Sequence, residues 1–254
     1  MRQARGGKAN ADDARGRDGK DAMATNRQHD GDHGGAVRAA LFDVDGTLVD
    51  TNYLHAVTWW EAFRQSGYTV PMADIHHSVG MGSDKLVAHL LGDRGDPDRD
   101  AQLSAAHKTL YATWFQRLRA FDKAADLLRA VADRGWRVVL ASSAGSDELA
   151  AMRAALGADD VIHAATGADD VTSSKPAPDL VERALERAGA DPEQAVFIGD
   201  TVWDVRAAGK AGVACVALLS GGIPPADLTE AGAIGVYRDP AHLLAELDDS
   251  PLAR

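Results

Sequence analysis

The chain has 254 residues, 26% of them charged, with a formal net charge of −11. This acidic balance argues against a nucleic-acid-binding protein, which needs a basic face. No apolar run approaches the roughly 20 residues of a membrane-spanning helix, which argues against a membrane protein. The single cysteine, Cys215, excludes an internal disulfide and is typical of a small buried strand residue.

Residues 1–35 are rich in Gly, Asp, Arg and Lys and contain almost no large apolar side chains. Such a segment cannot bury enough surface to order itself, so we expect a disordered polar tail. It lacks the hydrophobic stretch of a secretion signal, and we expect a cytoplasmic protein. Met23 is an alternative start, and a dispensable tail is favoured over an adaptor role.

From Val37 the chain alternates between apolar, strand-like runs and helical stretches. Strands are expected near residues 38–44, 136–141, 160–163, 195–199 and 213–218. Helices are expected near residues 123–134, 146–156, 178–188 and 203–210. This alternation predicts a three-layer α/β core of the Rossmann-like kind, with a parallel sheet covered on both faces. Ligands of such sheets bind outside the carboxyl ends of the strands.

A long, mainly helical insertion separates the first strand from Phe121. Helical periodicity is found in residues 54–64, 83–91 and 99–119. The aromatic residues of these stretches are more typical of a small hydrophobic core than of a ligand stack. We therefore expect the α/β core domain to comprise residues 36–52 and 121–254, and a helical domain to comprise residues 53–120.

The stretch Asp43-Val44-Asp45-Gly46-Thr47 directly follows the first strand. Gly46 permits a sharp bend and close approach of a ligand, so both carboxylates can be aimed at one reacting atom. One carboxylate can then act as a nucleophile and the other as an acid and base. An ordinary Asp/Gly turn is the alternative, because these residues favour turns for local reasons.

Polar residues also follow the later strands. Ser142 and Ser143 end the strand at 136–141, and Asp200 and Asp204 follow the strand at 195–199. Lys175 lies in a loop that Pro176 and Pro178 stiffen. If the turn after Asp200 runs into a helix, Asp204 points the same way as Asp200.

In order and spacing, these stretches resemble the phosphatase branch of the haloacid dehalogenase superfamily. The resemblance covers about residues 36–247, and the insertion resembles the helical C1 cap of phosphoglycolate phosphatase and β-phosphoglucomutase-like members. It implies that Asp43 attacks phosphorus to form an aspartyl-phosphate, with Asp45 as general acid and base. It also implies Mg²⁺, held by Asp43, Asp200 and the main-chain carbonyl of Asp45.

Further roles follow from the resemblance. Thr47 and Ser142 are expected to bind phosphate through their hydroxyls, with the main-chain N–H of Ser143 beside them. Lys175 supplies positive charge to the phosphoryl oxygens and to Asp43. Asp204 either orients a metal-bound water or is an acid favoured by the helix dipole.

The edge of the cap contributes further candidates. His55 stands where β-phosphoglucomutase-like proteins carry a His that can hydrogen-bond the acid/base Asp, which implies a contact with Asp45. A partly exposed His at a helix start is the alternative. In the turn at residues 79–85, glycines permit close approach of substrate. Lys85 can contact a substrate anion, although a solvated helix lysine is more common.

The resemblance implies a Mg²⁺-dependent phosphatase that acts on a small soluble phosphate monoester of the phosphoglycolate or sugar phosphate class. The alternative is a β-phosphoglucomutase-like phosphoryl transfer. That mutase uses a cap arginine where this chain has Ser83 and Asp84, although Lys85 or Arg94 can substitute. A catalytically silent binding or regulatory protein is the third possibility, and it is disfavoured because every chemical position is filled.

Overall fold

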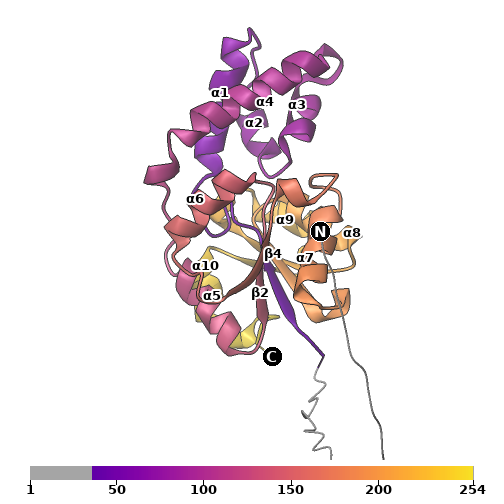
Figure 1. Ribbon diagram of the computed structural model, residues 1–254. Helices are drawn as coiled ribbons and strands as arrows, with labels where there is room; N and C mark the ends of the chain where they lie inside the picture. Colours follow the sequence, from indigo (N-terminus) through magenta and orange to yellow (C-terminus); the bar gives the residue numbers. More distant parts are fainter. Residues whose placement is uncertain (1–35, 254) are drawn as a thin grey trace, which may run out of the picture. The chain divides into compact units, whose positions relative to one another are not determined.

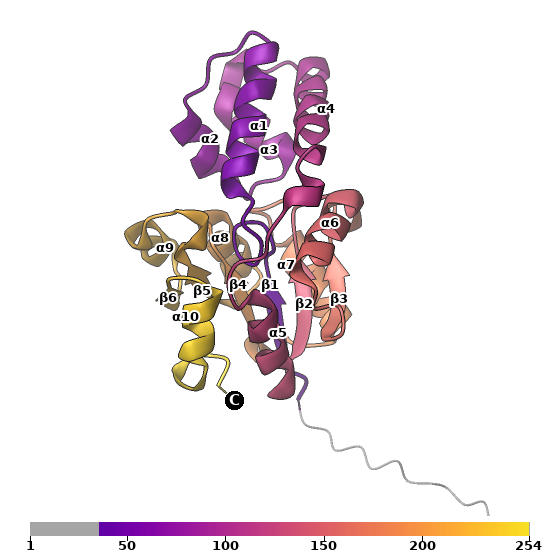
Figure 2. The same cartoon turned by 90° about the vertical axis from the view of Figure 1, so that its left-hand side faces the viewer.

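The computed structural model describes residues 36–253, so the tail expected at residues 1–35 lies outside the described residues. A parallel sheet has the strand order β3-β2-β1-β4-β5-β6 (Figure 2). Its strands are β1 (Ala39–Phe42), β2 (Arg137–Ala141), β3 (Ile162–Thr166), β4 (Ala195–Gly199), β5 (Ala214–Leu218) and β6 (Gly235–Tyr237). The predicted parallel α/β sheet is confirmed.

Helices cover both faces of this sheet (Figure 1). Ala40 and Phe42 of β1 join a buried cluster with α5 (Ala124–Asp133), α6 (Ser146–Leu156) and α10 (Pro240–Ala245). Ala39 and Leu41 join a second cluster with α7 (Asp179–Ala188), α8 (Val202–Lys210) and α9 (Pro225–Ala231). Alternate residues of a strand point to opposite faces, so one short apolar strand supplies both hydrophobic layers.

The strand order reverses at β1, which pairs with β2 on one side and with β4 on the other. The crevice outside the carboxyl ends at such a reversal is the usual place for a ligand in a parallel sheet. The chain leaves β1 into this crevice and then enters the helical insertion.

The insertion contains α1 (Asn52–Gln65), α2 (Met72–Ser78), α3 (Ser83–Leu91) and α4 (Pro97–Ala112). These helices lie together beyond the carboxyl ends of the strands (Figure 1). Trp59, Phe63 and Leu103 belong to a buried cluster of their own. The expected helical cap is confirmed, and Trp59 and Phe63 belong to its hydrophobic core.

The single helix expected at residues 99–119 was wrong. Asp96 caps α4 by accepting hydrogen bonds from the main-chain N–H groups of Asp98 and Arg99, and the helix ends at Ala112. Beyond it, Trp114 and Phe115 pack against the sheet cluster of the α/β core. The apolar periodicity of this stretch therefore serves two separate hydrophobic cores.

Among the α-helices and strands of residues 36–253, three short helices and one short strand were not predicted, namely α2, α9, α10 and β6. Their lengths of 7, 7, 6 and 3 residues leave too few positions for a periodic apolar pattern. Within residues 36–253, each helix is too short or too polar to cross a membrane.

Candidate active site

Asp43 stands at the carboxyl end of β1, where its side chain is buried. Its main-chain N–H donates to the carbonyl of Ile198, 2.8 Å away, which extends the pairing with β4 by one residue. Gly46 then turns the chain with φ +73°, and a Cβ at this position would lie 2.3 Å from the Asn52 side chain. The turn therefore requires glycine, as predicted from the sequence.

Three carboxylates meet at this end of the sheet. Asp43, Asp200 and Asp204 each place an oxygen within 4.8 Å of the other two. The Thr47 hydroxyl donates to Asp200 Oδ1 at 2.7 Å, and Asn52 Nδ2 donates to Asp200 Oδ2 at 2.7 Å. Asp200 is thus held in one orientation from both sides.

Lys175 reaches into the same cluster and is 1% exposed. Its Nζ lies 2.5 Å from Asp43 Oδ1 and 2.7 Å from Asp204 Oδ1. Burial opposes the charge of this lysine, but Asp204 and Asp43 outweigh burial and raise its pKa. Asp204 Oδ2 also accepts from the main-chain N–H and hydroxyl of Thr201, so Asp204 forms a capping box with Thr201, the N-cap residue of α8. Its expected role toward a metal-bound water stays a prediction.

The single charge of Lys175 does not balance the three buried carboxylates. Burial raises the pKa of Asp43 to about 7, and the charges of Asp204 and Asp45 add to the effect, although Lys175 opposes it. Burial, Asp204 and Asp43 together raise the pKa of Asp200 well above its usual value. A hard divalent cation would relieve this repulsion, and a donor set made of oxygens suits it. The cluster therefore fits a divalent metal.

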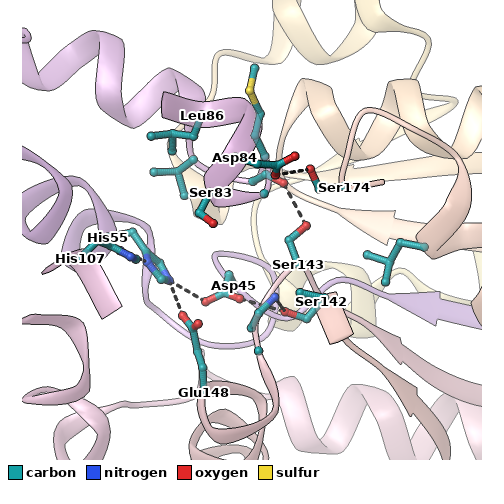
Figure 3. A pocket seen from close by; sticks show the side chains of 18 of the residues that line it. Asp45, His55, Ser83, Asp84, Leu86, His107, Ser142, Ser143, Glu148 and Ser174 are labelled. Atoms are coloured by element: carbon teal, nitrogen blue, oxygen red, sulfur yellow. Dashed lines mark hydrogen bonds and ion pairs between the residues drawn. The ribbon is translucent and has the colours of Figure 1, made fainter. Parts of the chain in front are cut away.

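Asp45 lines the same cavity, where its carboxylate lies between His55 and Ser142 (Figure 3). Its Oδ1 accepts from the Thr51 hydroxyl at 2.9 Å and contacts His55 Nε2 at 3.0 Å. Its Oδ2 accepts from the Ser142 hydroxyl at 3.1 Å. Burial alone would raise the pKa of Asp45, but the hydrogen bond and charge of His55 outweigh it and lower the pKa. These three donors fix the direction of the carboxylate.

The contact with Asp45 makes His55 part of the site. His55 is buried, with 8% of its surface exposed, so the partly exposed alternative was wrong. Burial works against a charge on this ring, but the hydrogen bond and charge of Asp45 prevail and raise its pKa. His55 therefore tends to hold a proton next to Asp45.

Glu148 and His107 each place a polar atom beside a ring nitrogen of His55, and both were missed in the sequence (Figure 3). Glu148 Oε1 of α6 lies 3.3 Å from His55 Nε2, and His107 Nε2 of α4 lies 3.1 Å from His55 Nδ1. Burial and the charge of Asp45 raise the pKa of Glu148 to about 7, against the influence of His55. Nothing in the local sequence distinguishes these two residues. Glu148 is an acidic residue in the first turn of α6, and His107 lies within α4.

The predicted phosphate-binding residues are present in the crevice and bind other protein groups there. Thr47 is fully buried and donates to Asp200. Ser142 donates to Asp45, and its hydroxyl accepts from the main-chain N–H of Ala144 at 3.0 Å. Ser143 donates to the carbonyl of Gly80 in the cap at 3.3 Å. Their role in phosphate binding stays a prediction.

A cavity of about 220 Å³ lies between the strand ends and the cap. Asp43, Asp45 and Ser142 line it from the core, and Trp59 and His107 line it from the cap. Pockets for drug-sized ligands are larger, at about 300–1,000 Å³. The cavity therefore suits a small ligand, with the carboxylates of Asp43 and Asp45 among its lining groups.

Lys85 and Arg94, the two cap cations considered for a second phosphate, have protein partners. The Lys85 ammonium lies 2.8 Å from the Ser173 hydroxyl. The Arg94 guanidinium donates to the carbonyls of Leu90 and Leu91 at the end of α3. Both cations are therefore engaged by protein acceptors.

The orientation of Asp200 leads to a first prediction. A Cβ at Gly221 would lie 1.8 Å from Asp200 Oδ2 and 2.7 Å from Asn52 Nδ2. We expect Gly221→Ala to displace Asp200 and to weaken divalent-metal binding, measured by calorimetry, by about 10–100-fold. Gly209→Ala is the matched control, because a Cβ there meets open space. Equal metal affinity in both variants would mean that Asp200 is not part of a metal site.

The chain is similar in sequence and in structure to known proteins. A family model described as haloacid dehalogenase-like hydrolase matches residues 37–212. The N-acetylmuramic acid 6-phosphate phosphatase of Pseudomonas aeruginosa is 30% identical over 220 residues, which cover 84% of this chain and 95% of that protein. A phosphoglycolate phosphatase of Yersinia pestis is 29% identical over 194 residues, 73% of this chain and 82% of that protein. The crystal structure of a hydrolase from Pseudomonas syringae superimposes with a TM-score of 0.80 at 32% identity, covering 84% of this chain and 98% of that one.

Proposed function

The chain belongs to the haloacid dehalogenase-like hydrolase family, and on that premise we propose that it is a Mg²⁺-dependent phosphatase of a small phosphate monoester. The observation that carries the proposal is the placement of two differently held carboxylates at one cavity. Asp43 is paired with Lys175 beside Asp200, and Asp45 is paired with His55. The phosphatase names of the two relatives support the same chemistry.

In the first step, a carboxylate oxygen of Asp43 forms a bond to phosphorus and the bond between phosphorus and the leaving oxygen breaks. Asp45 gives the leaving oxygen a proton, and the product alcohol departs. The pKa of Asp45 is lowered and that of His55 is raised, so the proton rests on His55 and reaches Asp45 across the 3.0 Å contact. The product of this step is an aspartyl-phosphate on Asp43.

In the second step, water attacks the phosphorus of the aspartyl-phosphate. Asp45 accepts the proton of the water, the bond between phosphorus and the Asp43 oxygen breaks, and phosphate leaves. Lys175 stays beside Asp43 throughout and balances charge on the phosphoryl oxygens. The step restores Asp43 as a carboxylate and returns the proton to the Asp45–His55 pair.

Mg²⁺ would be held by the carboxylates of Asp43 and Asp200 and by the main-chain carbonyl of Asp45. When bound, it offsets the repulsion between the attacking carboxylate and the phosphate dianion. Thr47 and Asn52 keep both oxygens of Asp200 in place for this purpose. Asp204 contributes by fixing Lys175.

The substrate is proposed to be a phosphoglycolate or a sugar phosphate, since a cavity of about 220 Å³ suits a small leaving group. Hydrolysis is favoured over β-phosphoglucomutase-like transfer. A mutase must hold a second phosphate, and Lys85 and Arg94 are both bonded to protein groups. The cytoplasmic location stays a prediction from the sequence.

The direct test is phosphate release from phosphoglycolate, hexose phosphates, glycerol phosphates and nucleotides, with Mg²⁺ and with EDTA. We expect kcat/KM for one small ester to exceed that for the others by at least about tenfold. A single contact between substrate and pocket that is present in one ester and absent in another changes kcat/KM by about this factor. EDTA should abolish the release. Release that survives EDTA would contradict the metal site, and conversion of β-glucose 1-phosphate to glucose 6-phosphate would establish the mutase.

A further inference from the structure

The first turn of α3 in the cap is hydrogen-bonded to the loop that carries Lys175. The Lys85 ammonium donates to the Ser173 hydroxyl at 2.8 Å and also to the main-chain carbonyl of Ser174. The Ser174 hydroxyl donates in return to Asp84 Oδ1 at 3.0 Å (Figure 3). Two adjacent cap residues thus hold two adjacent core residues, and we call these four side chains the cap clasp.

The surfaces on either side of the clasp fit closely. A Cβ at Gly82 would lie 2.3 Å from the Ser174 Cβ and 2.4 Å from its Oγ. Only a glycine lets the cap backbone come this near without moving Ser174. The absence of a side chain at Gly82 is therefore explained by docking against the core loop, in addition to any access that it gives to a substrate.

The cap clasp is directly adjacent in the sequence to Lys175, the buried lysine of the active site. Ser174 precedes Lys175, whose ammonium is buried between Asp43 and Asp204. The Ser174 carbonyl that accepts from Lys85 also accepts from the main-chain N–H of Ala177 at 3.0 Å. Lys85 therefore adds a charged hydrogen bond to the carbonyl that closes the turn around Lys175.

We propose that Asp84 and Lys85 are positioning residues, which couple docking of the cap to placement of Lys175 beside Asp43. The structural part of this inference rests on the contacts of the cap clasp. Its catalytic part rests on the proposed phosphatase function. If the cap moved away, the turn around Lys175 would lose the hydrogen bond from Lys85 and become less rigid. Lys175 is therefore placed most firmly beside Asp43 and Asp204 when the cap is docked. Because closure of a cap over a site generally excludes water, hydrolysis of the ester is then tied to substrate enclosure.

The test compares Lys85→Met, which removes the charge and keeps an unbranched side chain, with Lys85→Arg, which keeps the charge. Lys123→Met is the matched control, because Lys123 is an exposed lysine of the core with one surface partner, Asp126. Two quantities are measured in each variant. They are kcat and KM on the best ester, and the hydrogen-exchange rate of the Ala177 amide, which reports on the Ser174 carbonyl.

Loss of a charged hydrogen bond should lower kcat in Lys85→Met by about tenfold, with a smaller change in KM, and raise Ala177 exchange by a similar factor. Lys85→Arg should recover most of both effects, and Lys123→Met should change neither. A lower kcat with unchanged Ala177 exchange would overturn the proposal, because Lys85 would then act on the substrate directly. Unchanged Ala177 exchange with unchanged kcat would also overturn it. The exchange measurement decides the matter even if the wild-type protein releases no phosphate, an outcome that would count against the proposed function instead.

Discussion

Asp43→Asn should abolish phosphate release and leave the fold intact. An amide is not a nucleophile toward phosphorus, and loss of a nucleophile costs about 10⁴-fold or more in kcat. Burial raises the pKa of Asp43 to about 7, so its ionised form destabilises the folded state at pH values above the unfolded pKa. The neutral amide removes that cost, and Lys175 keeps its contact with Asp204.

This prediction is checked by phosphate release and by thermal unfolding of the same preparation at neutral pH. The melting temperature should stay the same or rise. Asp122→Asn, an exposed carboxylate of a core loop, is the control for the loss of one negative charge and should keep full activity. Persistent release by Asp43→Asn would mean that the nucleophile lies elsewhere.

Asp45→Asn should have the second largest effect, and the effect should depend on the leaving group. A positioned general acid and base is worth about 10²–10⁴ in rate, and the amide can neither give nor take the proton. With an alkyl ester as substrate, both formation and hydrolysis of the aspartyl-phosphate are slowed, because each step needs a proton transfer by Asp45. With acetyl phosphate, whose leaving group needs no proton, the first step is spared and only hydrolysis of the aspartyl-phosphate is slow.

The measurement is a pre-steady-state time course of phosphate and acetate from acetyl phosphate. Asp45→Asn should release about one equivalent of acetate quickly, while phosphate follows slowly. Thr51→Val is the companion variant, because it removes one hydrogen bond to Asp45 and leaves the carboxylate in place. It should lower kcat by about tenfold at most. Equal losses on all leaving groups would argue against Asp45 as the proton donor of the first step.

The residues of the active site that follow strands were predictable because the sheet itself brings them together. Asp43, Ser142 and Asp200 each come directly after a strand, and β1 lies between β2 and β4. Carboxyl ends of parallel strands meet at one edge of the sheet, so the apolar runs predict that these side chains lie at the same edge, and the strand order makes them neighbours. Their order and spacing then indicated the family.

The residues that reach the site from helices were not predictable in this way. Glu148 of α6 and His107 of α4 reach His55 through the tertiary fold, and nothing in their local sequence indicates the contact. Thr47 illustrates a different limit. Its place in the motif was recognised, but the 2.7 Å bond of its hydroxyl to Asp200 joins residues that are 153 positions apart.

The helix boundary expected from the sequence was wrong where one apolar pattern supplies side chains to two hydrophobic cores. The periodicity of residues 99–119 continues through Trp114 and Phe115, which pack against the sheet after α4 has ended at Ala112. A pattern reports that a side chain will be buried, and it does not report which cluster buries it.

The aspartyl-phosphate on Asp43 is the central claim, and trapping it is the most direct test. Asp45→Asn should be mixed with Mg²⁺ and acetyl phosphate, quenched, and reduced with borohydride, which converts an aspartyl-phosphate to homoserine. Peptide mass analysis should find homoserine at position 43, and the double variant with Asp43→Asn should give none. Homoserine at another aspartate, or turnover by the wild type without any phosphorylated residue, would contradict the account.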